Sequence, residues 1–175
     1  MVNPASLSKQ ELSAPALVAL LANLLLSKGW LLASAESCTG GLISAACTDL
    51  AGSSNWFERG FVTYSNEAKT DMLGVDAALI SAHGAVSEEV ARAMVQGAMG
   101  HSKAQVAVAV TGVAGPTGGS RAKPVGTVWF GFVVDGRLSS EMQRFDGNRA
   151  AVRAATVQHA LQRLLQLMQP LAEAP

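Results

Sequence analysis

Residues 36–41, ESCTGG, have the composition of a turn that presents a nucleophile. They lie between a predicted strand and a predicted helix, where such a turn exposes Ser37 at the carboxyl edge of a sheet. The backbone amides of Thr39, Gly40 and Gly41 at the helix start could then stabilise an oxyanion. A plain N-cap by serine or threonine is the alternative, and the motif alone does not separate the two.

Serine needs a base, because almost none of its hydroxyl is ionised at neutral pH. Lys69 follows the next predicted strand, and burial against an apolar wall lowers a lysine pKa enough to make it a base. If both strands end at one edge, Lys69 and Tyr64 converge on Ser37, and a Ser-Lys pair with a tyrosine relaying the proton suffices for amide hydrolysis. The alternative is a solvated Lys69 beside an acidic neighbour.

Cys38 is a rival nucleophile, because the same helix start would lower the pKa of its thiol. Neighbouring side chains at a strand end point in opposite directions, so we expect only one of Ser37 and Cys38 to face a pocket. The three histidines occupy turn or helix positions that need no catalytic explanation. They are His83, His101 and His159.

Two other segments indicate ligand binding. The glycine-rich loop 111–119 lets backbone amides approach a phosphate or ribose, although it matches neither the Walker A loop nor the dinucleotide fingerprint. Arg149 and Arg153 stand near the start of the last predicted helix, where positive charge opposes the helix dipole. A phosphate bound there would explain this placement, and a solvated pair near Asp146 is the alternative.

Hydrophobic periodicity predicts the elements that position these residues. Helices are expected over 13–28, 42–50, from Ser87 onward and over about 149–169; strands over 30–35, 57–65, 105–110 and a hairpin of 125–134 with 138–145. Strands alternating with helices predict the α/β class, a three-layer α/β/α sandwich with a mixed, mostly parallel sheet and one antiparallel strand. A single domain is expected over 12–170, with loose tails at 1–11 and 171–175.

Charge and composition exclude several functional classes. Thirteen basic residues balance thirteen acidic ones, so no overall field favours nucleic acid or an anionic membrane. Two cysteines in one predicted loop and helix do not form a disulfide framework and suit a reducing cytoplasm. The apolar stretch 14–26 is shorter than the roughly 20 residues that span a bilayer.

Five motifs, in this order, resemble the CinA C-terminal domain family over roughly residues 12–167. They are AESCTGG at 35–41, WFERGFVTYSNEAK at 56–69, HGAVS at 83–87, GVAGP at 112–116 and KPVGTV at 123–128. Members of that family are amidases that convert nicotinamide mononucleotide to nicotinic acid mononucleotide and ammonia. The family fold is also a three-layer α/β/α domain.

The resemblance implies a set of site residues. Catalysis is carried over to Ser37, Tyr64 and Lys69, and substrate binding to Thr111, Gly112 and Gly115 of the glycine-rich loop and to Arg149 for the phosphate. It implies no cofactor and no metal, a homo-oligomer, and the stand-alone form without the upstream domain of longer members.

The expected partner is therefore a small molecule, nicotinamide mononucleotide, with no nucleic acid or membrane. Two other functions remain open. One is a pyridine-nucleotide-binding or competence-associated module without catalysis. The other is an amidase for a different small carboxamide.

Overall fold

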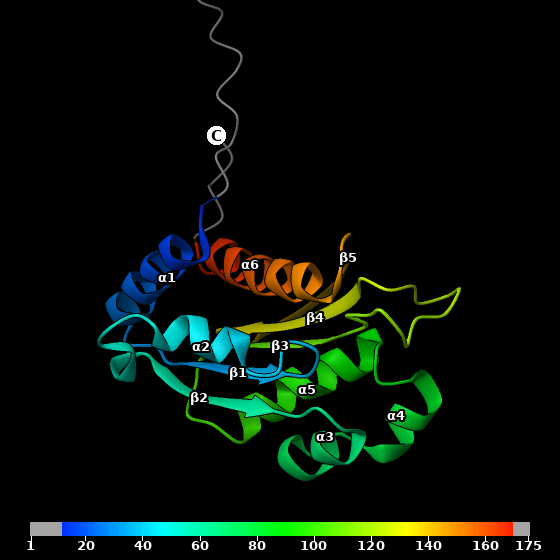
Figure 1. The fold of residues 1–175 in the computed structure, drawn as a ribbon. Coiled ribbons are helices and arrows are strands. Elements are labelled where there is room, and N and C mark those ends of the chain that lie inside the picture. The colour runs from blue at the N-terminus through cyan, green and yellow to red at the C-terminus, as the bar shows by residue number, and fades with distance from the viewer. Residues whose placement is uncertain (1–11, 170–175) are drawn as a thin grey trace, which may run out of the picture.

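A five-stranded sheet runs through the middle of the molecule, with helices on both faces (Figure 1). The computed structural model describes residues 12–169. In sheet order the strands are β2 (Phe57–Val62), β1 (Leu32–Glu36), β3 (Val106–Gly112), β4 (Thr127–Val134) and β5 (Arg137–Arg144). One face carries α1 (Ala14–Lys28), α2 (Leu42–Thr48) and α6 (Arg149–Met168); the other carries α3 (Asn66–Leu73), α4 (Ala77–His83) and α5 (Glu88–Gly100). A short 3-10 helix, η1, spans Ser53–Asn55.

The sheet is mixed. Strand β1 pairs in parallel with both β2 and β3, whereas β4 pairs antiparallel with both β3 and β5. Within this sheet β4 therefore runs against the other strands. The predicted α/β/α sandwich with a mostly parallel sheet and one reversed strand is confirmed.

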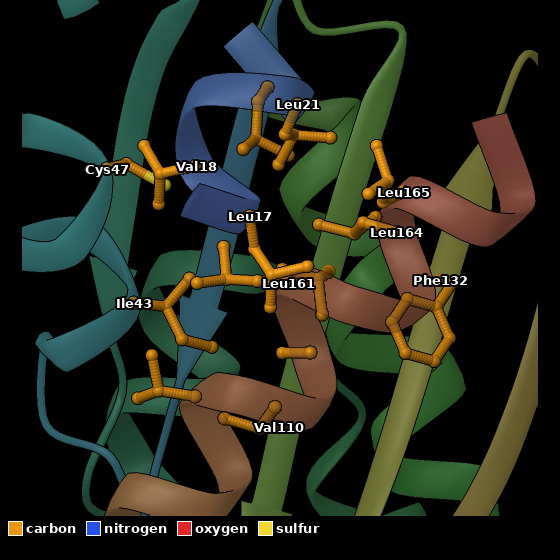
Figure 2. Packing of buried hydrophobic residues seen from close by; sticks show 14 of the residues in the cluster. Leu17, Val18, Leu21, Ile43, Cys47, Val110, Phe132, Leu161, Leu164 and Leu165 are labelled. Atoms are coloured by element: carbon orange, nitrogen blue, oxygen red, sulfur yellow. The ribbon is translucent and has the colours of Figure 1, made fainter. Parts of the chain in front are cut away.

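Alternate residues of the central strands build two different cores. The valines of β3, at 106, 108 and 110, join the core beneath α1, α2 and α6, while Ala107 and Ala109 join the core beneath α5. In the first core Leu17 of α1 meets Leu161 of α6 above the sheet (Figure 2). On the other face small residues let α5 approach closely, since a Cβ at Gly131 would lie 2.5 Å from the Ala91 carbonyl oxygen.

Helix ends follow the chemistry of their caps. The Ser87 hydroxyl accepts a hydrogen bond from the Val90 amide and starts α5 where it was predicted. Gly29 ends α1 in the left-handed conformation, with φ of 64°. Asn148 caps α6 by accepting from the Ala151 amide.

Several element bounds differ from prediction. Strand β3 continues to Gly112, because Thr111 and Gly112 pair with β4 opposite Trp129 and Val128, so the glycine-rich loop begins later than expected. The short helices α3 and α4 were not predicted. The tails at 1–11 and 171–175 lie outside the described residues, and the single domain over 12–170 stays a prediction. None of the helices within 12–169 is long and apolar enough to cross a membrane.

Candidate active site

The candidate site lies at the carboxyl edge of the three parallel strands. Ser37 directly follows β1, and its amide donates to the carbonyl of Val110 in β3 at 3.0 Å. On the other side of β1, the Thr63 amide donates to the Glu36 carbonyl at 2.9 Å. Both neighbouring strands therefore hold the chain at the start of residues 36–41, which we call the nucleophile turn.

Lys69 reaches this edge from α3. The Ser65 hydroxyl caps the helix by accepting from the Ala68 amide, which places Lys69 one turn inside it. Its Nζ lies 3.1 Å from Ser37 Oγ, and the side chain is only 1% exposed. Burial lowers the pKa of Lys69 below its usual range, because the charged form is poorly solvated there.

Backbone carbonyls orient the Lys69 amine. Its Nζ donates to the Thr63 carbonyl at 2.8 Å and lies 3.4 Å from those of Tyr64 and Ser65. A neutral amine has two N–H donors and one lone pair. If Lys69 is neutral and its hydrogens are directed to the carbonyls, its lone pair would face the Ser37 hydroxyl, which is the arrangement a general base requires.

Glu36 anchors the turn from inside and was missed by the sequence reasoning. Its buried carboxylate accepts from Thr39 Oγ1 at 2.7 Å, from the amides of Ile43 at 2.8 Å and Ser44 at 2.9 Å, and from Ser44 Oγ at 2.7 Å. It thus occupies amides at the start of α2 that would otherwise lack partners. The signal in the sequence was a lone acid in an otherwise uncharged strand. Gly60 of β2 leaves room for this cluster, because a Cβ there would lie 2.2 Å from Ser44 Oγ.

The predicted oxyanion amides do not have equal roles. The Gly40 amide donates to the Ser37 carbonyl at 3.1 Å and so closes the turn. The amides of Thr39 and Gly41 have no acceptor among residues 12–169. Their role as oxyanion donors stays a prediction.

Cys38 borders the same cavity as Ser37, contrary to the expectation that only one of them would. The chain leaves the strand after Glu36, so strict alternation of side chains no longer applies. The Cys38 thiol is 5% exposed, and burial raises its pKa to about 11. A thiol with that pKa stays protonated at neutral pH and is a poor nucleophile.

A cavity of about 230 Å³ opens above the Ser37–Lys69 pair. It is lined by Ser37, Cys38, Tyr64, Asn66, Lys69, Ala85, Val86, Thr111, Gly112, Ala114 and Arg149. Six of the predicted site residues therefore meet here, three of them from segments beyond residue 100. Thr111 is fixed by a hydrogen bond from its hydroxyl to the Ala85 carbonyl at 2.8 Å.

A second cavity of about 650 Å³ adjoins the first at Ala114 and Arg149. Arg149 donates to the Gly115 carbonyl at 3.0 Å and to the Tyr64 hydroxyl oxygen at 3.0 Å. Gly115 thus contributes a carbonyl acceptor for Arg149, whose side chain borders both cavities. Tyr64 is 61% exposed, and its hydroxyl contacts Arg149 and neither Ser37 nor Lys69.

Arg153 contacts the nucleophile turn from outside. Its Nε donates to the Cys38 carbonyl at 3.1 Å and its Nη2 to the Thr39 carbonyl at 2.9 Å. The sequence grouped Arg153 with Arg149 at the helix start. In the structure both arginines are held by oxygen acceptors of the protein.

The three histidines are not among the residues that line this cavity. The ring nitrogens of His83, His101 and His159 contact, in that order, Glu89 Oε1 at 3.2 Å, the Gly97 carbonyl at 2.8 Å and Glu141 Oε1 at 2.6 Å. Within residues 12–169, His, Cys, Asp and Glu side chains form no group of three that could hold a metal ion.

The family is decided by a match along nearly the whole described chain. The model of the CinA C-terminal domain matches residues 15–168. The chain belongs to this family. The resemblance of its five sequence motifs to CinA C-terminal domains is thereby confirmed.

Relatives within the CinA family cover most of the chain. It is 59% identical over 134 residues to the nicotinamide-nucleotide amidohydrolase PncC of Pseudomonas putida, covering 77% of this chain and 84% of that protein. It is 55% identical over 140 residues to the protein of the same name from Enterobacter agglomerans, covering 79% and 85%. The crystal structure of the competence/damage inducible protein CihA from Agrobacterium tumefaciens superposes with a TM-score of 0.84 at 45% identity, over 89% and 96% of the two chains.

Proposed function

We propose that this CinA-family chain is a nicotinamide-nucleotide amidohydrolase that converts nicotinamide mononucleotide to nicotinic acid mononucleotide and ammonia. The observation that carries the proposal is the 3.1 Å contact between Ser37 Oγ and a buried Lys69 with lowered pKa. The names of the two relatives at 55% and 59% identity supply the substrate.

In the proposed mechanism, neutral Lys69 takes the Ser37 proton as Oγ attacks the carboxamide carbon. The carbonyl oxygen becomes an oxyanion, which accepts hydrogen bonds from the Thr39 and Gly41 amides. Protonated Lys69 then gives its proton to the leaving nitrogen, and the C–N bond breaks to release ammonia. Water, deprotonated by Lys69, hydrolyses the acyl-enzyme and regenerates Ser37. A relay of this proton through Tyr64 stays a prediction.

The two adjoining cavities support a nucleotide rather than free nicotinamide as substrate. The smaller one holds the Ser37–Lys69 pair, and the larger one extends past Arg149 to the start of α6. A guanidinium at a helix N-terminus suits a phosphate, because helix amides and the arginine donate to the same anion. We therefore assign the carboxamide to the smaller cavity and the phosphate to the region of Arg149.

A binding module without catalysis is less well supported. Burying a lysine costs free energy that a simple binding site does not require, whereas a general base needs the lowered pKa that burial produces. An amidase for another carboxamide would use the same Ser37–Lys69 pair and would differ only in what the second cavity binds. The substrate series below separates it from the proposed activity.

We also propose a small molecule as the partner, with no nucleic acid or membrane, and a cytoplasmic homo-oligomer as the working form. Balanced charge supports the first point. The buried free thiols of Cys38 and Cys47 support a reducing compartment. The oligomer rests on the family resemblance, and light scattering after gel filtration tests it.

The deciding experiment measures ammonia release by the purified chain and its Ser37→Ala variant. Nicotinamide mononucleotide, nicotinamide riboside and nicotinamide are compared at equal concentration. We expect turnover of the nucleotide, far slower turnover without the phosphate, and none above background with Ser37→Ala, whose circular dichroism and Tm stay close to wild type. Tight nucleotide binding by calorimetry without ammonia would establish the binding module, and equal turnover of all three compounds would refute the phosphate assignment.

A further inference from the structure

We propose that Arg153 is a positioning residue, which fixes the peptide planes of the nucleophile turn and thereby sets how well this turn stabilises the transition state. The proposal rests on the proposed amidase function. It concerns a contact between α6 and residues 38–39, which lie more than 100 positions apart in the sequence.

The guanidinium of Arg153 spans two successive carbonyls. Nε binds the Cys38 carbonyl and Nη2 the Thr39 carbonyl, at 3.1 and 2.9 Å. A planar fork of donors suits this task, because it fixes both the distance and the relative tilt of the two acceptors. The side chain is half-buried, so water competes only partly for these carbonyls.

Peptide planarity carries this contact to the other side of the turn. In a trans peptide the C=O and the following N–H point in opposite directions. Holding the Cys38 and Thr39 carbonyls toward Arg153 therefore directs the N–H groups of Thr39 and Gly40 away from it. The Gly40 N–H closes the turn on the Ser37 carbonyl, and the Thr39 N–H has no acceptor within residues 12–169.

Glu36 holds the same residue from the opposite side. Its Oε1 accepts from Thr39 Oγ1 at 2.7 Å. Thr39 is therefore held through its side chain by the Glu36 carboxylate and through its carbonyl by the Arg153 guanidinium. The plane that carries the Thr39 N–H is held at its other end, because Arg153 Nε donates to the Cys38 carbonyl, so this plane cannot rotate freely. An oxyanion donor fixed before the reaction avoids reorganisation during it, which is the main source of its catalytic effect.

The helix dipole gives an independent reason to look for such a role. An arginine in the early turns of a helix opposes the positive end of the dipole. Arg153 also stands four residues after Arg149, a spacing at which like charges repel. The two carbonyl contacts offset this conflict. Because Arg153 also borders the larger cavity, a direct phosphate contact is the competing role.

The test compares Arg153→Ala, Arg153→Lys and wild type with two substrates, nicotinamide mononucleotide and nicotinamide riboside. A positioning role lowers kcat for both substrates by the same factor, about 10- to 100-fold, with little change in KM. Arg153→Lys recovers little of the lost kcat, because a single ammonium cannot span two carbonyls. Added guanidinium chloride, far below denaturing concentrations, should restore part of the activity of Arg153→Ala and none of the loss in Arg153→Lys.

Arg163→Ala is the matched control. Arg163 lies on the same helix and donates to Glu141 Oε2 at 2.9 Å, away from both cavities. We expect this variant to lose some Tm and keep its kcat. A loss of Arg153→Ala activity that only follows its folded fraction, or that appears only as a higher KM for the phosphorylated substrate, would overturn the positioning role.

Hydrogen exchange separates this inference from the function it rests on. Losing the Arg153 contact should speed exchange of the Gly40 amide, whatever the substrate, because the turn opens more often. If wild type releases no ammonia, the proposed function fails and the Gly40 exchange rate still decides whether Arg153 holds the turn. If wild type is active and Arg153→Ala matches it in kcat and exchange, only the positioning role fails.

Discussion

The Nη2 of Arg149 lies 3.0 Å from the hydroxyl oxygen of Tyr64. The tyrosine predicted to relay a proton therefore contacts the arginine predicted to bind the phosphate. This arrangement ties Tyr64 to substrate binding more directly than to proton transfer.

Replacing Tyr64 with phenylalanine tests this relationship. The variant removes one acceptor for a charged donor, which is worth about 1.5 kcal/mol, so we expect KM for nicotinamide mononucleotide to rise about 10-fold. We expect kcat to stay within about twofold of wild type. Steady-state ammonia release gives both constants, and a 100-fold fall in kcat at constant KM would instead establish the relay.

The lowered pKa of Lys69 predicts the pH dependence of the rate. Because the base must be neutral, kcat should rise with pH and level off above the Lys69 pKa, with a midpoint below 10.5, the usual lysine value. A pH–rate profile with its midpoint at or above 10.5 would exclude Lys69 with a lowered pKa as the general base.

The same pKa shift predicts how stability depends on pH. Between the folded pKa of Lys69 and 10.5, the unfolded chain holds a proton at this residue that the folded chain has lost. The free energy of unfolding therefore rises with pH across this interval, by at most about 1.4 kcal/mol per pH unit. Urea titrations at several pH values should show this component in wild type and not in Lys69→Met.

Cys38 should be dispensable. Its thiol has a pKa of about 11 and is buried, so wild type should keep its activity after iodoacetamide treatment at neutral pH. Cys38→Ala should keep kcat within about threefold, with a Tm loss from the small cavity that it leaves. Rapid inactivation that follows alkylation of Cys38, shown by mass spectrometry, would identify the Cys38 thiol as the nucleophile in place of Ser37.

Glu36→Gln should harm both stability and catalysis. A glutamine side chain has one acceptor oxygen and one NH2 group, and the NH2 group cannot accept from a backbone N–H. At least one backbone N–H at the start of α2 therefore loses its partner, at a cost of about 1–3 kcal/mol. We expect a clearly lower Tm and a lower kcat, since the turn is no longer held from inside. Ser34→Ala removes a 3.3 Å bond to the same carboxylate and a 2.9 Å contact with Ser44 Oγ, leaves every backbone amide with its partner, and serves as the mild comparison.

The convergence of Ser37 and Lys69 could be predicted because parallel strands end at one edge of a sheet. Each residue comes after the end of its strand, so sheet geometry predicted that the two could meet, while a solvated Lys69 stayed open as the alternative. The hairpin of β4 and β5 could also be predicted from sequence, since its turn at Asp135 and Gly136 is a local signal.

Other features depend on contacts between distant segments. Thr111 and Gly112 have the composition of a loop, and pairing with β4 makes them strand. The Arg153 contact requires α6 to pass over the nucleophile turn, which no periodicity in residues 149–168 indicates. Helices α3 and α4 are too short to give a clear pattern, and α3 is nevertheless the element that carries Lys69.

The pairing of β1 with β2 determines where the chain can change length. Leu32 pairs with Phe57 and Ala33 with Arg59, so Glu58 is one residue more than the partner strand requires. This irregularity lies at the amino end of the strands, opposite to the edge that carries Ser37. Deleting Glu58 would leave the pairing from Ala33 onward intact, whereas a deletion between Gly60 and Lys69 would move the amine away from its serine. We therefore expect a change of chain length at Glu58 to disturb the site far less than a change of length between Gly60 and Lys69, although the two lie only a few residues apart.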